Sequence, residues 1–425
     1  MSNLLATLRK STSALDAMTD AVAITQNNVM NAGTAGYARQ KVSLEALQFN
    51  PETGYAGGVK NGKLHSARDI YIERAVRIQA GKTAAAQTSA ISLTKLEQAL
   101  PISAGGSVPS ALNRLYSAFS AWAVAPEDRG SKEQILTTAE GVAASFRNTA
   151  RTLSEVERDN STEIRAVVDR VNRLAGRIQQ FNADIRSGSV NDAGVDAGIH
   201  ATLEELSADA NIEVNVQEDG TYTLLLNGET PLVIGQKQYE LSVDSDTVQT
   251  HTGGRLGALL QFRDGALANE RQQLDRLAEK IADRLSEFFT GSTAATLTVN
   301  PTLDGSTLSA VDSGPPPVAN GKALQLAALA NPVNAADKLD GMSFTEFYGQ
   351  IAADVGGKLS EARFEEQSQT QLAAQAAAFR DRVSGVSLDE EAIHLVEFQR
   401  SYQANARMIA AIDELMEIAV NIGRA

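Results

Sequence analysis

Both ends of this 425-residue chain carry a long stretch whose apolar residues repeat at alternating steps of four and three. This is the spacing of a helix with a single apolar stripe, as in a coiled coil. Near the N-terminus the stripe runs over residues 4–29 and stops at the glycines of 31–36. Its apolar members are Leu4, Leu8, Leu15, Met18, Val22 and Val29. A helix of this kind has to bury its stripe, so it needs a partner.

The C-terminus repeats the pattern. Ser387 followed by Glu390 has the spacing of a capping box, which starts a helix. Asn405 lies within the stripe, where a lone polar residue can fix the register of a coiled coil. The members of this second stripe are Leu388, Leu395, Phe398, Tyr402, Asn405, Ile409, Ile412, Met416 and Ala419. We therefore expect the two ends to be assembly helices, with additional burial supplied by neighbouring chains.

The middle of the chain is predicted to be helical with one β insert. Further capping boxes at Ser131/Gln134 and Ser343/Glu346 indicate helix starts, and period-two runs around Asp219-Gly220 and Asn227-Gly228 indicate hairpins. The predicted fold class is mainly α with a small β element: a terminal α-helical coiled coil plus an elongated helical rod domain with β hairpins. The expected segments are 1–40 (N-terminal helix and motif), 41–69 (extended linker), 70–382 (helical rod, with the β insert at about 205–250 and a loop region at about 290–322) and 383–425 (C-terminal helix).

Composition excludes several classes of function. The net charge is -14, which opposes non-specific binding to nucleic acid or to an anionic membrane. No apolar run reaches the length of a membrane span, and the N-terminus lacks the apolar core and cleavage site of a secretory signal. The chain has no cysteine, and its four histidines are scattered without ligand spacing. We therefore expect no metal and no cofactor.

No catalytic pattern is present. Gly81-Lys82-Thr83 imitates the end of a phosphate-binding loop, but Val76 occupies the position of the first glycine. Asp389, Glu390 and Glu391 could be an acid/base cluster, yet acidic residues are also favoured in the first turn of a helix by its dipole. Trp122, the only tryptophan, is better explained as a core residue than as a ligand platform. The sequence predicts that the chain is not an enzyme.

The stretch from Asn27 to Gln40 resembles the N-terminal signature of the bacterial flagellar axial proteins. The signature requires asparagines, a threonine, a glycine, a tyrosine and an arginine at fixed spacing, and every position is met. These residues are Asn27, Asn28, Asn31, Thr34, Gly36, Tyr37 and Arg39. Gly36 would allow a backbone turn after the helix, and Tyr37 and Arg39 could anchor it. Rod, hook and hook-associated proteins share this signature.

Other segments are similar to one family within that group, flagellar hook-associated protein 1. They are the C-terminal segments 385–391 and 398–406, the turn and helix at 253–264, and the long helix at 164–186. The chain is short for this family, and 290–322 leaves no room for the usual large outer β domain.

The resemblance implies a structural adaptor at the junction between hook and filament. About eleven copies would form a helical ring, with the terminal helices as an antiparallel coiled coil lining the inner tube. The implied partners are the chain itself, the hook protein, a second junction protein on the filament side, the flagellar type III export apparatus and an export chaperone at the C-terminus. The implied location is the extracellular flagellum, reached without a cleaved signal peptide.

Two alternatives remain at this stage. A flagellar hook or distal rod protein would share the signature, although the segments at 388–391 and 253–264 favour the junction family. A surface-exposed adhesin or secreted hydrolase carried on flagellar tails would need a catalytic or sugar-binding constellation in the middle of the chain, where the sequence shows none.

Overall fold

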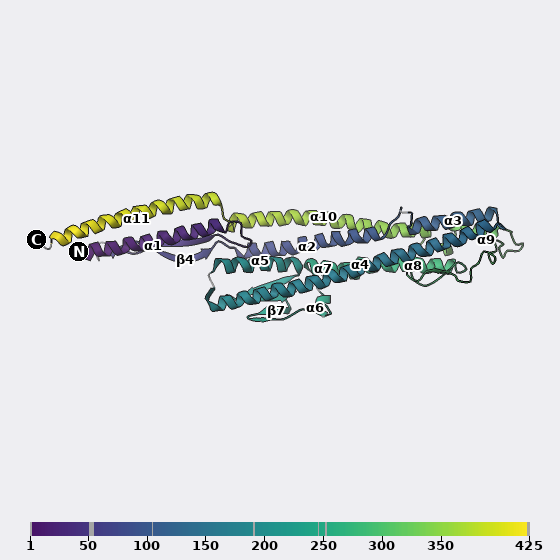
Figure 1. Cartoon of the computed structure of the whole chain (residues 1–425), viewed down its shortest axis with the longest axis horizontal. Helices are drawn as coiled ribbons and strands as arrows, with labels where there is room; N and C mark the ends of the chain where they lie inside the picture. The colour runs from purple at the N-terminus through teal and green to yellow at the C-terminus, as the bar shows by residue number, and fades with distance from the viewer. Residues whose placement is uncertain are drawn as a thin grey trace. The chain divides into compact units, whose positions relative to one another are not determined.

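The computed structural model describes residues 2–50, 55–103, 105–189, 192–244, 246–250 and 253–422. Helices hold 68% of the chain and strands 10%, which confirms the predicted class of a mainly α protein with a small β element. The helices are α1 (Ser2–Met30), α2 (Ile70–Ala99), α3 (Val108–Val124), α4 (Arg129–Asp184), α5 (Ala193–Asp209), α6 (Asp246–Gln249), α7 (Gly254–Gln261), α8 (Ala268–Arg284), α9 (Gly321–Ala327), α10 (Phe344–Ser384) and α11 (Leu388–Ile422) (Figure 1).

The strands form small antiparallel sheets. They are β1 (Gln40–Ala46), β2 (Phe49–Asn50), β3 (Tyr55–Ala56), β4 (Val59–Ser66), β5 (Ile212–Val216), β6 (Tyr222–Leu226), β7 (Thr230–Ile234), β8 (Lys237–Gln238), β9 (Phe289–Thr290) and β10 (Thr298–Val299). The largest sheet has the order β5-β6-β7-β8 and lies within the predicted β insert. Its β6–β7 turn places Asn227 and Gly228 in the left-handed region, at φ 54° and 78°, as the Asn-Gly dipeptide predicts.

The chain forms two compact units. Unit 1 contains residues 1–80, 171–240 and 371–425, and unit 2 contains residues 81–170 and 241–370. These units divide the chain differently from the segments expected from the sequence, because α2, α4 and α10 each contribute residues to both. The expected boundaries at 40, 69 and 382 stay predictions about the organisation of the chain.

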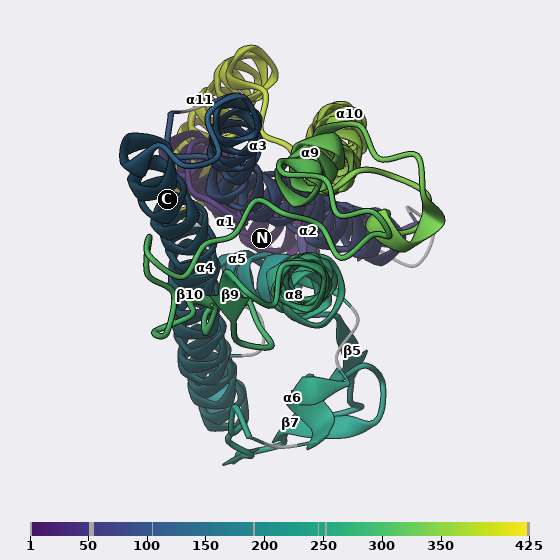
Figure 2. The same cartoon turned by 90° about the vertical axis from the view of Figure 1, so that its right-hand side faces the viewer.

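Unit 2 is a helical bundle with large buried side chains. Figure 2 views α3, α8, α9 and α10 nearly end-on. Trp122 of α3 is completely buried and donates its indole N–H to the carbonyl of Pro126, so it is a core residue, as predicted. Phe119 meets Phe288 edge to face, with ring centroids 5.2 Å apart. The region 290–322 adds to this core, because Leu297 and other apolar residues of that stretch are buried.

The starts of α10 and α4 test two of the predicted caps. At Ser343 the full capping box is present: its N–H donates to Glu346 Oε2, and the N–H of Glu346 donates to Ser343 Oγ. The box predicted at Ser131 is wrong, since Asp128 accepts from the N–H of Ser131 and α4 begins at Arg129. An aspartate three residues upstream offers a carboxylate to the same free N–H groups.

In the described part of 41–69, expected as an extended linker, the chain is extended and forms paired strands. β1 and β4 form an antiparallel ladder from Gln40↔Ser66 to Ala46↔Val59, with an irregularity between Val42 and Leu44. The ladder contacts α1, where Ser13 Oγ donates to the carbonyl of Val59. Pairing of the strands satisfies backbone polar groups that an unpaired linker would expose to water. The strands belong to unit 1.

Candidate functional site between the terminal helices

Helices α1 and α11 lie side by side and run in opposite directions (Figure 1). Near one end of the pair Asn28 of α1 bonds Glu391 of α11, and further along Ser11 lies against Met408. The two contacts are equally spaced along both helices, which is the pattern of an antiparallel pair. The helical ends of the chain therefore contact each other.

The predicted stripe residues lie mainly on the contacting faces. Met18 and Ile412 are buried, whereas Val29, Leu388 and Tyr402 are at least 40% exposed. The remaining members with described side chains are half-buried: Leu8, Leu15, Val22, Leu395, Phe398, Asn405, Ile409, Met416 and Ala419. The side chain of Leu4 lies outside the described residues. The role of these residues in contacts with other chains stays a prediction.

Asn28 is the centre of the signature segment. It is 1% exposed, and its amide makes a two-way pair with the backbone of Gln40: Nδ2 donates to the Gln40 carbonyl and Oδ1 accepts from the Gln40 N–H, each at 2.9 Å. Oδ1 also accepts from the Tyr37 hydroxyl at 2.8 Å, and Nδ2 donates to Glu391 at 3.1 Å. Only an amide can donate and accept in this way, so the end of α1, the loop and α11 all depend on this residue.

The remaining asparagines and the threonine of the signature close the end of α1. Asn31 Nδ2 donates to the carbonyl and to Oδ1 of Asn27, and Asn31 Oδ1 accepts from Thr34 Oγ1. The N–H of Tyr37 then donates to the carbonyl of Thr34. These short-range bonds satisfy groups that a helix end leaves free, so the chain turns tightly after Met30.

Gly36 occupies a position that no other residue fits. Its φ is +73°, and a Cβ atom there would lie 2.3 Å from the backbone oxygen of Ala197 in α5. The close approach also lets Arg68 donate to the Gly36 carbonyl at 2.6 Å. The glycine predicted to allow a turn therefore also permits contact with α5.

Arg39 connects the signature to the first turn of α11. Its guanidinium pairs with Glu391 at 2.6 Å and with Glu390 at 2.9 Å, and its backbone N–H donates to the carbonyl of Ser384 at the end of α10. Glu391 is 2% exposed, so its charge depends on Arg39 and Asn28 for compensation. The acids of 389–391 lie in the first turn of α11, as interpreted from the sequence, and two of these three carboxylates also pair with Arg39.

This use of Glu390 also changes the predicted cap at Ser387. The hydroxyl of Ser387 accepts from the N–H of Glu390 at 3.4 Å, which is half of a capping box. The carboxylate that would return the bond in a full box is turned to Arg39 instead.

Tyr37 completes the network. Burial, with the charge of Glu391 as a smaller cause, raises the pKa of its phenol to about 12. The hydroxyl therefore stays protonated at neutral pH and donates to Asn28 and Asn27.

A second polar cluster lies next to this loop, and sequence reasoning missed it. Arg68 pairs with Glu73 of α2 at 2.7 Å and with Asp196 of α5 at 2.8 Å. Glu204 of α5 pairs with Arg380 of α10 at 2.7 Å. These residues are far apart in sequence and belong to no short motif. The only available signal was the mixture of acidic and basic residues at 68–77.

His200 lies between these charges and stays neutral. Burial and the nearby cations Arg68, Arg77 and Arg380 lower its pKa from 6.5 to about 2. The carboxylates of Asp196 and Glu73 lie 3.6 and 3.9 Å from its ring nitrogens, too far to hydrogen bond and offset that effect.

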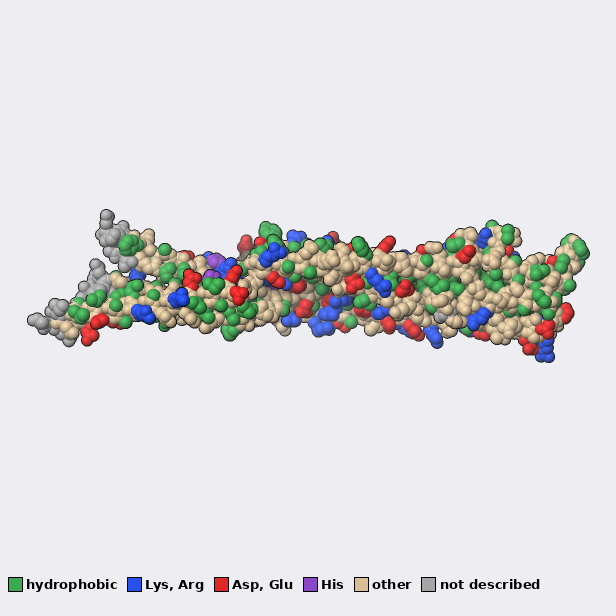
Figure 3. Space-filling view, turned by 90° about the horizontal axis from the view of Figure 1, so that it is seen from above, with side chains coloured by type: hydrophobic (Ala, Val, Ile, Leu, Met, Phe, Trp, Pro, Cys, Tyr) green, Lys and Arg blue, Asp and Glu red, His purple; other side chains and the backbone are tan. Residues whose placement is uncertain are grey.

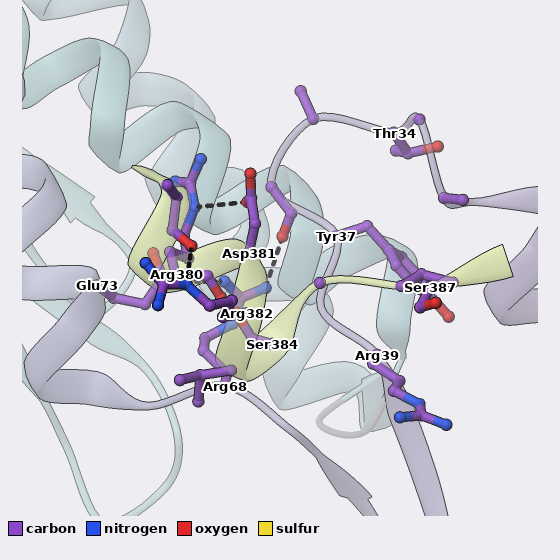
Figure 4. Close-up of a pocket in the computed structure, with 18 of the residues that line it drawn as sticks. Thr34, Tyr37, Arg39, Arg68, Glu73, Arg380, Asp381, Arg382, Ser384 and Ser387 are labelled. Atoms are coloured by element: carbon purple, nitrogen blue, oxygen red, sulfur yellow. Dashed lines mark hydrogen bonds and ion pairs between the residues drawn. The ribbon is translucent and has the colours of Figure 1, made fainter. Parts of the chain in front are cut away.

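The loop and the α10–α11 connection line a polar cavity of about 890 Å³. Figure 4 shows Thr34 and Tyr37 on one side of it and Arg68, Glu73 and Arg380 on the other. Its charged groups are largely engaged in the ion pairs described above. This arrangement holds backbone segments together.

The described part of the chain contains no group of acidic or histidine side chains that could hold a metal ion. Within the same residues, no helix is long and apolar enough to cross a membrane.

Comparison with protein families agrees with this architecture. Residues 381–422, which include α11, match the model of the flagellar basal body rod FlgEFG protein C-terminal region. Residues 93–291 match the flagellar hook-associated protein FlgK helical domain. These matches and the signature network define a structural protein of the flagellar axis.

Individual relatives narrow this class. Flagellar hook-associated protein 1 of Bacillus subtilis strain 168 is 25% identical, and the alignment covers 96% of each chain. The proteins of the same name from Salmonella typhimurium and Escherichia coli K12 are 23% and 22% identical, over 96% of this chain and 98% of theirs. A structure titled the flagellar hook junction protein FlgK from Burkholderia pseudomallei shares the fold, with a TM-score of 0.65 and 14% identity over 73% of this chain and all of that one. Over 96% of its length the chain is thus similar to proteins named flagellar hook-associated protein 1.

The alignments also bear on chain length. The alignment with the Salmonella protein spans 548 positions, whereas this chain has 425 residues. The relative therefore carries segments that this chain lacks, in line with the expectation that the chain is short for its family.

Proposed function

We propose that this protein is a structural adaptor that assembles between the flagellar hook and filament, so that flagellin can polymerise beyond it. Its role is geometric, because an adaptor between two tubes has to present a compatible face to each. Relatives that align with nearly the whole chain carry the name hook-associated protein 1, whereas the rod-protein match is confined to 381–422. This favours the junction over a hook or distal rod protein. We assign no enzymatic activity to the chain.

One observation carries the proposal. In the terminal pair, formed by α1 and α11, one face of α11 is covered by α1 and the opposite face is exposed. This exposed face carries a second apolar stripe. Figure 3, which views the molecule from above, shows hydrophobic side chains along the terminal helices. This outer stripe consists of Ile393, Val396, Leu415 and Ile418, which are 46–67% exposed. An exposed apolar stripe of this length fits a surface that other subunits cover.

The finer details follow from the same proposal. About eleven copies form the ring, with the hook protein on one side and a second junction protein on the other. The chain leaves the cell through the flagellar type III apparatus without a cleaved signal. Before assembly an export chaperone covers the apolar face of the C-terminal helix, as a groove covers an amphipathic helix. Retention of a chaperone by residues 386–425 in a pull-down supports this step, and its absence contradicts it.

The decisive experiment is electron microscopy of a strain that lacks the chain, with flagellin measured in the medium. We expect intact hooks without filaments and flagellin released into the medium. Missing hooks would assign the chain to the rod or hook, and normal filaments would contradict the proposal.

Complementation then tests the outer stripe. We expect Leu415→Lys/Ile418→Lys to leave the strain without filaments, because charge on the stripe opposes burial by neighbouring subunits. The matched control is Ala406→Lys/Ala410→Lys, which adds the same charge to exposed positions of α11 away from the stripe. Filaments from both variants, or from neither, would contradict a specific role of the stripe.

A further inference from the structure

Helix α2 carries an exposed stripe that none of the contacts described above uses. Tyr71, Arg74, Ile78 and Lys82 follow one another at steps of three and four, so they share one face of the helix. Tyr71 is 78% exposed and Ile78 is 51% exposed. Within the described residues, neither Arg74 nor Lys82 has an ion-pair partner. We call these four residues the α2 stripe; Lys82 is also the lysine of the false phosphate-loop pattern.

The other face of α2 is fully engaged. Glu73 is buried and pairs with Arg68, and Arg77 interacts electrostatically with Tyr222 of the β5–β8 sheet. In Figures 1 and 2 helix α5 lies between α2 and the strands of this sheet. The α2 stripe therefore points away from the sheet, although α5, the sheet and the start of α2 all belong to unit 1.

The β5–β8 sheet has the opposite electrostatic character. Residues 212–240 contain a single lysine or arginine, Lys237, and five acidic residues. Asp219 pairs with Arg186, but the other four carboxylates are exposed and have no ion-pair partner in the described part of the chain: Glu213, Glu218, Glu229 and Glu240. Ile234 adds an exposed apolar side chain to the same sheet. We call this the acidic sheet surface.

Within unit 1, Tyr71, Arg74 and Ile78 thus lie on the side opposite the acidic sheet surface, and Lys82, at the start of unit 2, continues the stripe along the same helix. The two surfaces cannot meet within one chain, but each can meet its counterpart on a neighbouring copy. A contact between two unlike surfaces, repeated around an axis, produces a ring or a helix of subunits rather than a closed dimer. Opposite charge also fixes the register of such a contact.

We propose that the acidic sheet surface of one copy docks on the α2 stripe of the next copy, as the lateral contact of the assembled ring. This inference rests on the proposed function, since it identifies the surfaces through which the copies of that ring meet. Tyr71 and Ile78 would be covered by the sheet, and the carboxylates of Glu213 and Glu229 would face Arg74 and Lys82. A Cβ atom at Gly228 would be 2.7 Å from Glu213 Oε2. Because Gly228 directly precedes Glu229, the two glutamates lie near each other.

A charge swap in the full-length chain tests this contact. The variants are Arg74→Glu/Lys82→Glu, Glu213→Lys/Glu229→Lys and the combination of all four, each expressed in the strain that lacks the chain. We expect either reversal alone to lower incorporation into isolated flagella about tenfold, and the combination to restore it to within about twofold of wild type. The control Glu155→Lys/Glu279→Lys changes the net charge as much as the sheet reversal, at exposed positions of unit 2. Circular dichroism establishes that each purified variant is folded.

Three results would overturn the contact: normal incorporation of both single reversals, no recovery in the combined variant, or equal loss in the control. Failure of the proposed function is seen separately, as absence of the wild-type chain from the hook–filament junction. In that case sedimentation of concentrated purified chains still tests the contact. The contact is supported if each reversal variant alone fails to associate and a mixture of the two variants associates again. In such a mixture the wild-type α2 stripe of one variant can meet the wild-type acidic sheet surface of the other. Unchanged sedimentation of the single variants contradicts the contact.

Discussion

The core of unit 2 and the terminal pair α1–α11 are stabilised in different ways. The unit 2 core contains fully buried large side chains, among them Trp122, Phe119, Phe146 and Tyr348. The terminal pair buries mostly small or polar groups, and only a few larger residues such as Met18 and Ile412. Its small and polar members are Ser11, Ala17, Ala21, Thr25, Asn28 and Glu391.

This difference has a physical consequence for assembly. Burial of large apolar side chains stabilises unit 2 by about 1.5–3 kcal/mol for each, independently of any partner. Small residues let α1 and α11 pack closely, but their burial contributes little to the free energy of folding. The polar network fixes the relative position of the two helices more than it stabilises them. The outer stripe of α11 is left for other subunits. A region that gains its stability on assembly is thus attached to one that is stable by itself.

The largest effect is expected from the unit 2 core. Phe146→Ala should lower the free energy of unfolding of this unit by about 3–5 kcal/mol, because it removes a fully buried ring and leaves a cavity. Urea unfolding followed by the fluorescence of the single tryptophan, Trp122, measures it. Phe364→Ala, at a position 75% exposed, is the control and should have little effect. Equal losses for the two variants would contradict a core of this kind.

The polar network is the corresponding test for the terminal pair. Glu391→Gln removes the buried charge that pairs with Arg39, and we expect a loss of about 3 kcal/mol in the opening free energy of this region. Hydrogen exchange of the amides in 38–42 and 388–398 measures it, while the Trp122 transition should stay unchanged. Glu390→Gln is the matched control: its side chain is 61% exposed, so a loss of under about 1 kcal/mol is expected. If the two variants behaved alike, the burial of Glu391 would have no energetic role.

The sequence predicted the parts of the molecule that depend on local patterns. Helical periodicity indicated α1 and α11, Asn227-Gly228 indicated a hairpin, and Ser343/Glu346 indicated a cap, because each depends on residues a few positions apart. The signature marked Asn28, Gly36 and Arg39 without revealing their partners. Glu391 is 363 residues from Asn28, and no spacing rule reaches that far.

Other features were missed because competing partners decide them. Asp128, and not Ser131, caps the start of α4. The carboxylate of Glu390, which would complete the capping box at Ser387, pairs with Arg39. The cluster of Arg68, Asp196 and His200 exists only because α5 packs beside the loop. Such choices depend on tertiary contacts, which local propensity does not contain.

The His200 cluster allows the two regions to be separated by pH. Because the pKa of His200 falls from 6.5 to about 2 on folding, its contribution to stability is complete above pH 6.5 and is lost as the pH falls from there toward 2. A fully bound proton corresponds to about 1.4 kcal/mol per pH unit, and the unfolded histidine is only half protonated at pH 6.5, so unit 1 should lose about 1 kcal/mol between pH 6.5 and 5.5. Hydrogen exchange around α5 at the two pH values measures it. His200→Gln should flatten this dependence, and an unchanged slope in that variant would assign it to other groups.

The smallest effect is expected from the Tyr37 hydroxyl. Tyr37→Phe removes the donor to Asn28 Oδ1, which still accepts from the N–H of Gln40, so the loss should be about 1 kcal/mol in hydrogen exchange of the loop at 34–40. Tyr71→Phe, at an exposed ring, is the control and should change nothing there. In the wild type the pKa of Tyr37 is raised from 10.0 to about 12, so its contribution is complete below pH 10 and is lost as the pH rises through 12. Tyr37→Phe should lack this alkaline loss. A variant as sensitive as the wild type would show that the hydroxyl is not part of the anchor, and that Asn28, Arg39 and Glu391 suffice to hold the signature loop to α11.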